Sequence, residues 1–251
     1  MFYVLATVLG AITGSFLNVC IFRLPHDESV VFPGSHCQSC KKPIAALDNI
    51  PVLSFLILKG RCRHCAAKIS LQYPLVEILS SCLFVLFYTY FGLTAKGILY
   101  LLFSLALLVE TFIDLRHQII PDVITLPGIL IGLAASTMFP PLHGQGLWWQ
   151  GLLKSLIGML VGGGFLYLTG TIAGIILKKE ALGGGDVKLL AMIGALLGWP
   201  GVAWTIFVSS ALGSVVGIYL RIKNGEERIP FGPYIAAGAF FYLFFGQKIT
   251  L

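Results

Sequence analysis

Residues 97–115 read GILYLLFSLALLVETFIDL, and this stretch decides the class of the fold. It is long enough to cross a membrane, because a transmembrane helix needs about 20 mostly apolar residues. Of the 251 residues in the whole chain, 57% are hydrophobic and 11% are charged, whereas soluble domains carry about a quarter charged residues. A chain of this composition could not keep its surface hydrated, so lipid must be its main solvent.

Similar apolar stretches recur along the chain. Their approximate ranges are 2–22, 74–92, 97–115, 123–139, 151–177, 187–199, 202–220 and 231–247. Lipid offers no partners for open sheet edges, so these stretches should be helices. The sequence therefore predicts an all-α polytopic membrane protein with about eight transmembrane helices. The first stretch lacks a basic n-region and has a long apolar run, so we expect a retained anchor and not a cleaved signal peptide.

The positions of lysine and arginine predict the orientation, because these residues gather in short loops on the cytoplasmic side. Fourteen of the 17 fall on one side of the expected spans, namely Arg23, Lys41, Lys42, Lys59, Arg61, Arg63, Lys68, Arg116, Lys178, Lys179, Lys188, Arg221, Lys223 and Arg228. The other three are Lys96, Lys154 and Lys248. Both termini are therefore expected to face outward. The net charge of +6 requires only anionic lipid headgroups as partners, and no nucleic acid.

A polar loop follows the first span and predicts a separate small domain. We expect residues 1–23 to form the first transmembrane helix, 24–73 a cytoplasmic zinc-ribbon-like loop domain, and 74–251 the transmembrane core. The loop contains two Cys-x-x-Cys pairs separated by 21 residues, and the four cysteines are Cys37, Cys40, Cys62 and Cys65. This spacing is typical of a structural zinc site with four thiolate ligands. The alternatives are redox-active dithiols or free cysteines.

Between the two cysteine pairs lies a short apolar segment, DNIPVLSFLILKG, at residues 48–60. It could form a strand of the zinc ribbon, or it could lie on the membrane surface. The sequence alone does not choose between these two interpretations.

Carboxylates within or beside the spans are the candidate functional groups, because an ionisable side chain in lipid is costly. Glu110 and Asp114 are four residues apart and share one helix face. Asp114 lies toward a helix C-terminus, the end that disfavours a negative charge. Asp122 opens the next span, where a helix-capping role explains it well. Glu77 is a further acid, in the second span.

Asp186 follows three glycines in the sequence EALGGGDVKLL at residues 180–190. The local pattern is equally typical of a flexible loop that ends in an N-cap aspartate. The expected topology, however, places Asp186 at the same membrane edge as Asp114. Two carboxyl groups that meet at one depth can share a proton, so that one activates water while the other polarises a peptide carbonyl. The glycines would let a substrate backbone or a neighbouring helix come close.

These motifs resemble those of the prepilin peptidases, the type IV leader peptidase family within the GxGD intramembrane aspartic proteases. The resemblance covers nearly the whole chain. It includes GSFLNVCIFRLP at 14–25, both cysteine pairs, YPLVE at 73–77, IDLRHQIIPD at 113–122 and GGGDVKLLAMIGALLGW at 183–199. It implies Asp114 and Asp186 as the catalytic aspartates. Asp122 is also characteristic of the family, and we interpret it as structural.

The resemblance further implies an activity. Such enzymes remove the short basic leader from type IV prepilins and pseudopilins after a glycine, at the cytoplasmic face of the bacterial inner membrane. Many also methylate the new N-terminal amine with S-adenosylmethionine. No glycine-rich nucleotide motif supports that second activity independently. Glu77 is the most suggestive residue for it, and helix packing beside Pro74 is the alternative. The pilin clients and the oligomeric state stay open.

Two other functions would also place acids in a membrane protein. A proton- or ion-coupled transporter would use them to carry charge, but such groups are usually near the bilayer midplane. A non-enzymatic scaffold that recruits a partner through a zinc ribbon would not need either aspartate. KNGEERIPFGP at 223–233 is either a lining of the substrate entry or a helix stop.

Overall fold

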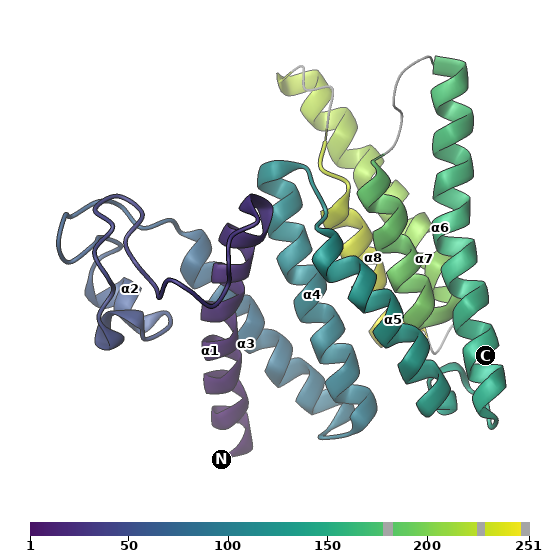
Figure 1. Ribbon diagram of the computed structural model, residues 1–251, viewed down its shortest axis with the longest axis horizontal. Coiled ribbons are helices and arrows are strands. Elements are labelled where there is room, and N and C mark those ends of the chain that lie inside the picture. The colour runs from purple at the N-terminus through teal and green to yellow at the C-terminus, as the bar shows by residue number, and fades with distance from the viewer. Residues whose placement is uncertain (178–182, 225–228, 247–251) are drawn as a thin grey trace. The chain divides into compact units, whose positions relative to one another are not determined.

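The computed structural model describes residues 1–177, 183–224 and 229–246, and within these ranges the chain is helical and contains no β-strand (Figure 1). The helices in chain order are α1 (Phe2–Arg23), η1 (Leu24–His26), η2 (Ala46–Asn49), α2 (Leu53–Ile57), α3 (Gln72–Phe91), α4 (Ala95–His117), α5 (Asp122–Met138), η3 (Pro140–His143), α6 (Trp148–Leu177), α7 (Gly184–Asn224) and α8 (Gly232–Phe245). The predicted all-α fold is confirmed.

Five of the described helices are long and apolar enough to cross a membrane, namely α1, α3, α4, α6 and α7. Two shorter apolar helices, α5 and α8, account for two more of the expected spans. The remaining difference between the helices and the expected spans concerns α7. This one helical stretch covers the two ranges 187–199 and 202–220 that the sequence predicts as separate spans.

The interruption of α7 occurs at Gly198, whose φ of 71° and ψ of 178° are not helical. This conformation is essentially restricted to glycine, and Pro200 follows two residues later. Gly162 of α6 lies against both the Leu190 carbonyl and the Val202 side chain, which are on opposite sides of the break. The two legs of α7 therefore run side by side as a hairpin, so the two expected helices are present, and whether each leg crosses the membrane stays a prediction.

Some residues used to predict the orientation lie outside the described parts of the chain. They are Lys178, Lys179, Arg228 and Lys248. The sidedness of the protein stays a prediction.

The chain divides into two compact units, residues 1–109 and 110–251. In the first unit, α1 and α3 pack antiparallel, with Gly10 against the Ser81 backbone and Gly14 against the Glu77 backbone. Gly10 and Gly14, the two ends of the sequence GAITG at residues 10–14, thus form the small-residue packing face that helix association in lipid favours. The second unit contains the end of α4 together with α5, α6, α7 and α8. The predicted domain ranges 1–23, 24–73 and 74–251 are not tested by this division.

The polar loop between α1 and α3 folds back along α1 and does not extend away from the end of that helix (Figure 1). Asn49 and Pro51 of the loop line a cavity together with Ser15 and Phe16, which lie in the middle of α1. The segment that the sequence left open as a strand or a surface segment forms the short helices η2 and α2. The strand alternative is therefore wrong.

The hairpin turn provides a test of the fold. Gly198→Ala should lower the free energy of unfolding by about 1–3 kcal/mol, because alanine cannot adopt this backbone conformation without strain. Gly164→Ala is the matched control, since an added methyl group there meets no atom within 4 Å. Thermal unfolding of both variants in detergent measures the difference. Equal stability of the two variants would contradict the proposed role of Gly198.

Candidate functional site

Asp114 lies in the last turn of α4, and its side chain is only 5% exposed. Its Oδ2 atom accepts a hydrogen bond of 2.8 Å from the backbone amide of Gly232, the first residue of α8. The amides in the first turn of a helix have no partner within the helix. This hydrogen bond therefore gives the buried Asp114 carboxylate a donor and the otherwise unpaired Gly232 amide an acceptor.

Position 232 requires a glycine, because the Asp114 side chain lies too close to its backbone to leave room for a Cβ atom. A Cβ atom at this position would lie 2.8 Å from Asp114 Oδ2 and 3.2 Å from Asp114 Cγ. The PFGP sequence was open to two interpretations, an entry lining or a helix stop. The structure makes it the start of α8 and the contact to Asp114. Sequence reasoning missed this contact, since 118 residues separate the two partners.

Asp186 lies in the first turn of α7, half-buried, with its amide bonded to the Gly183 carbonyl at 3.1 Å. Its carboxyl group is within range of Coulombic repulsion from that of Asp114. The structure thus brings together, at one end of the second unit, the two aspartates on separate helices that the sequence singled out. The catalytic role of the pair stays a prediction.

The glycines before Asp186 do not all have the same surroundings. A Cβ atom on Gly185 would lie 2.9 Å from Ile120 Cβ, in the connection between α4 and α5. The close approach of a neighbouring segment therefore explains Gly185. A Cβ atom on Gly184, in contrast, would meet nothing within 4 Å, so packing within the described chain gives no reason for a glycine there.

Asp122 begins α5 as expected, but its side chain makes no capping hydrogen bond, and Pro121 is the N-cap residue. No side-chain cap is therefore formed, although Asp122 does lie in the first turn, where the helix dipole favours a carboxylate. Both carboxylate oxygens of Asp122 instead accept hydrogen bonds of 2.7 Å from Nζ of Lys188. Lys188 lies two positions after Asp186 in the sequence. The two side chains are 54% and 41% exposed, and such pairs contribute only about 0–1 kcal/mol. The pair joins α5 to α7 beside Asp186.

Glu110 lies one turn before Asp114 on α4, on the same helix face as predicted. It is buried, and neither carboxylate oxygen has a hydrogen-bond partner among the described residues. It lies close enough to Asp114 for Coulombic repulsion. The aspartate pair therefore has a third carboxyl group beside it.

The four predicted cysteine ligands come together in the first unit. The Sγ atoms of Cys37, Cys40, Cys62 and Cys65 all lie within 4.8 Å of one another. The Sγ atoms of Cys37 and Cys65 are 3.8 Å apart, which is about the edge of a tetrahedron with 2.3 Å zinc–sulfur bonds. The residues therefore fit a tetrahedral four-thiolate site. His36 and His64 are not part of the cluster.

The two cysteine pairs are built in the same way. The amide of Cys37 donates to the Lys42 carbonyl, and the amide of Cys62 donates to the Ala67 carbonyl, both at 2.9 Å. Residues 35–44 and 60–69 thus form two copies of one knuckle, a repeat visible as HCQSCKKPI and RCRHCAAKI that the sequence analysis missed. Amides of Cys40 and Ser39 bond the Cys37 sulfur and lower the pKa of this thiol to about 6. The knuckle therefore favours the thiolate form that binds metal.

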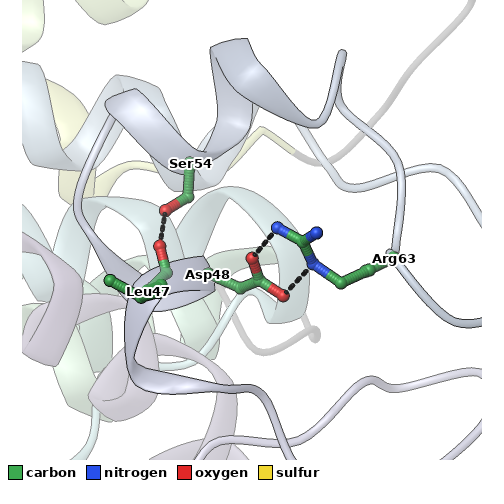
Figure 2. Close-up of polar contacts among 4 residues, drawn as sticks. All are labelled: Leu47, Asp48, Ser54 and Arg63. Carbon is green, nitrogen blue, oxygen red and sulfur yellow. Dashed lines mark hydrogen bonds and ion pairs between the residues drawn. The ribbon is translucent and has the colours of Figure 1, made fainter.

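A polar contact inside the loop holds the second knuckle against η2 (Figure 2). The Arg63 guanidinium donates two hydrogen bonds, of 2.6 and 2.7 Å, to the Asp48 carboxylate. These bonds keep the pKa of Asp48 below its usual range. The salt bridge adds a fixed point to a domain with few buried apolar side chains.

Glu77 of α3 is buried, and its Oε2 atom accepts a hydrogen bond of 2.7 Å from the backbone amide of Val52. Val52 is the N-cap residue of α2. Glu77 therefore fastens the loop domain to the side of α3. This is a structural contact, and a role in methyl transfer stays untested.

Two models of known protein families match this chain. Residues 8–91 match the model of the bacterial peptidase A24 N-terminal domain, and residues 101–218 match that of the type IV leader peptidase family. Two similar proteins named prepilin leader peptidase/N-methyltransferase come from Pseudomonas putida and Pseudomonas aeruginosa. They are 35% and 36% identical to the chain, and each alignment covers 99% of this chain and 92% of the relative.

A third relative, from Escherichia coli, is named type 4 prepilin-like proteins leader peptide-processing enzyme. It is 39% identical, with 94% of this chain and 91% of the relative covered. No solved structure matches the chain. The chain belongs to the type IV leader peptidase family.

Metal content tests the cysteine site. We expect the purified chain to hold one zinc ion, and Cys37→Ser should lose it because three thiolates no longer close the shell. Cys82→Ser is the matched control, since Cys82 is an exposed cysteine of α3 outside the cluster. Elemental analysis by mass spectrometry measures the zinc-to-protein ratio. Unchanged zinc in the Cys37 variant would exclude the predicted site.

Proposed function

We propose that this chain cleaves the short basic leader from type IV prepilins and pseudopilins after a glycine, and then methylates the new N-terminal amine. The proposal of a peptidase activity rests on the proximity of Asp114 and Asp186 at one end of the helices. The names of the relatives, which describe leader processing and N-methylation, support both activities.

The proposed mechanism uses one aspartate as a general base and the other as an acid. The base removes a proton from a water molecule, which attacks the peptide carbonyl. The protonated partner donates a hydrogen bond to the carbonyl oxygen as negative charge develops there. The Gly232 amide holds the Asp114 carboxylate in position through its hydrogen bond. The peptide bond then breaks, and the aspartate that took the proton from water returns it to the leaving amine.

The position of the aspartates favours hydrolysis over ion transport. Asp114 lies in the last turn of its helix and Asp186 in the first turn of its own. The ion pair of Asp122 and Lys188 beside them is open to water. A transporter would be expected to hold its acids near the bilayer midplane. A membrane-edge site suits a substrate whose apolar segment is in lipid and whose leader is in water.

We further propose that this end faces the cytoplasm of a bacterial inner membrane. The excess of lysine and arginine in the loops at this end supports that orientation. A basic leader would then be cut on the side where it is synthesised.

The cofactors belong to the proposal as well. Zinc would be held by the four cysteine thiolates and would fix the fold of the loop without taking part in catalysis, since the shell leaves no open position. S-adenosylmethionine would supply the methyl group. A cavity of about 290 Å³ lies between α1 and the loop, but it does not fit this donor. Arg23 already binds the Ser29, Pro33 and Gly34 carbonyls, and no carboxylate lines the cavity.

Substitution of the aspartates tests the peptidase. Asp114→Asn and Asp186→Asn should each reduce leader removal from a purified prepilin by at least about 10³-fold, because each acid is needed for proton transfer or charge stabilisation. Asp122→Asn is the matched control and should keep substantial activity, because its ion pair is exposed. Gel analysis of the processed prepilin measures the rates. Normal processing by either of the first two variants would exclude this pair.

The positioning role of the amide can be tested separately. Gly232→Ala should lower kcat for leader removal more than it raises KM, because the methyl group would displace the Asp114 carboxylate. Gly164→Ala, in α6 and away from the aspartates, is the control, since a methyl group there meets nothing within 4 Å. A Gly232 variant with unchanged kcat would show that the hydrogen bond does not position the carboxylate for catalysis.

A further inference from the structure

The short helix α2 exposes its apolar side and buries its polar side. Leu53, Leu56 and Ile57 lie at positions i, i+3 and i+4 on one helix face, and they are 56%, 64% and 74% exposed. Ser54 is only 7% exposed and donates a hydrogen bond of 2.9 Å to the Leu47 carbonyl (Figure 2). No described residue covers the three apolar side chains.

The depth of this helix follows from the contact between the loop and α3. The Val52 amide, directly before α2, binds the Glu77 carboxylate, and Glu77 lies five residues inside α3. At a rise of 1.5 Å per residue, the Glu77 backbone, which holds Val52 through its side chain, is about 7.5 Å along α3 from the start of that helix. An amphipathic helix buries its apolar face about 5–10 Å into the boundary between headgroups and acyl chains. With the start of α3 at the headgroup level, the distance along α3 matches this depth.

A second contact supports the same depth. Asn18 of α1 donates a hydrogen bond of 3.0 Å to the carbonyl of Tyr73 at the start of α3. The cavity-lining residues Ser15 and Phe16 lie further from the end of α1 than Asn18 does, and they face Asn49 and Pro51 of the loop. The loop next to α2 therefore reaches below the level at which α3 begins.

The charge of the loop is complementary to an anionic lipid surface. Between residues 24 and 71 there are six lysines and arginines and three acidic residues, and Asp48 is already paired with Arg63. Lys59 lies two residues after the end of α2 and is exposed. Basic side chains beside an apolar face are typical of segments that bind phosphate headgroups while their apolar residues enter the bilayer.

We propose that α2 is a membrane-docking helix, which inserts the exposed face formed by Leu53, Leu56 and Ile57 into the lipid leaflet at which α1 ends and α3 begins. Anionic phospholipid is the partner. The cysteine knuckles are then held at the membrane surface by three connections: α1, α3 and this lipid contact.

Photo-crosslinking tests the docking in the full-length chain, reconstituted in nanodiscs of phosphatidylglycerol and phosphatidylcholine. Leu56→p-benzoylphenylalanine places the photoreactive group on the proposed face. Gln38→p-benzoylphenylalanine is the matched control, because Gln38 is exposed in the first knuckle. Intact-mass and peptide mass spectrometry identify the adducts, and unchanged zinc content and thermal unfolding show that each variant is folded.

We expect several-fold more lipid adduct at position 56 than at position 38, and the same result for Ile57→p-benzoylphenylalanine. Equal lipid adducts at positions 56 and 38 would overturn the proposal. Crosslinks from position 56 to another part of the chain, or to a second copy, would identify a protein surface as the cover and would also overturn it. The absence of any adduct at position 56 would show a solvated face, with the same consequence.

Discussion

Two buried carboxylates of this chain take their hydrogen-bond donors from the starts of helices, whereas Glu110 has no partner among the described residues. Asp114 accepts from the Gly232 amide at the start of α8, and Glu77 accepts from the Val52 amide at the start of α2. Few polar side chains are available in so apolar a sequence, whereas each helix start leaves several amides unpaired. One physical solution therefore serves both units. In the second it holds an acid of the candidate active site, and in the first it fastens the loop domain.

The same constraint explains what the sequence could and could not predict. Apolar runs and scarce acids are local features, so the helical class, Asp114 and Asp186 could be found from the sequence. The Gly232 contact could not, because it joins residues 118 positions apart and a single glycine does not reveal which side chain approaches it. The hydrogen-bond partner of Asp122 was missed for the same reason, since it also lies far away in the chain. The position of Asp122 at a helix start favours capping, but Lys188 of another helix is the partner that folding brings to it.

The loop shows a second limit of local patterns. Apolar residues between the cysteine pairs are equally compatible with a strand and a helix, because a short apolar run has no decisive period. The structure selects a five-residue helix, which is too short to be stable alone. Its conformation depends on Ser54 bonding to the Leu47 carbonyl and on Glu77 binding the amide before it. These tertiary contacts, and not helix propensity, decide the local structure.

The length of α7 before its turn has a consequence for the chemistry. Residues 184–197 span about 21 Å as a helix, which is less than the roughly 30 Å of hydrocarbon in a bilayer. A leg this short cannot place both of its ends at the membrane surfaces. With the Gly198 turn near one surface, Asp186 would be drawn below the other, where an apolar substrate segment can reach it. The exposed ion pair of Asp122 and Lys188 beside it keeps a route open to water. Hydrolysis of a peptide bond at the edge of a membrane needs both of these conditions, and a short helix leg that begins at the acid would provide them together.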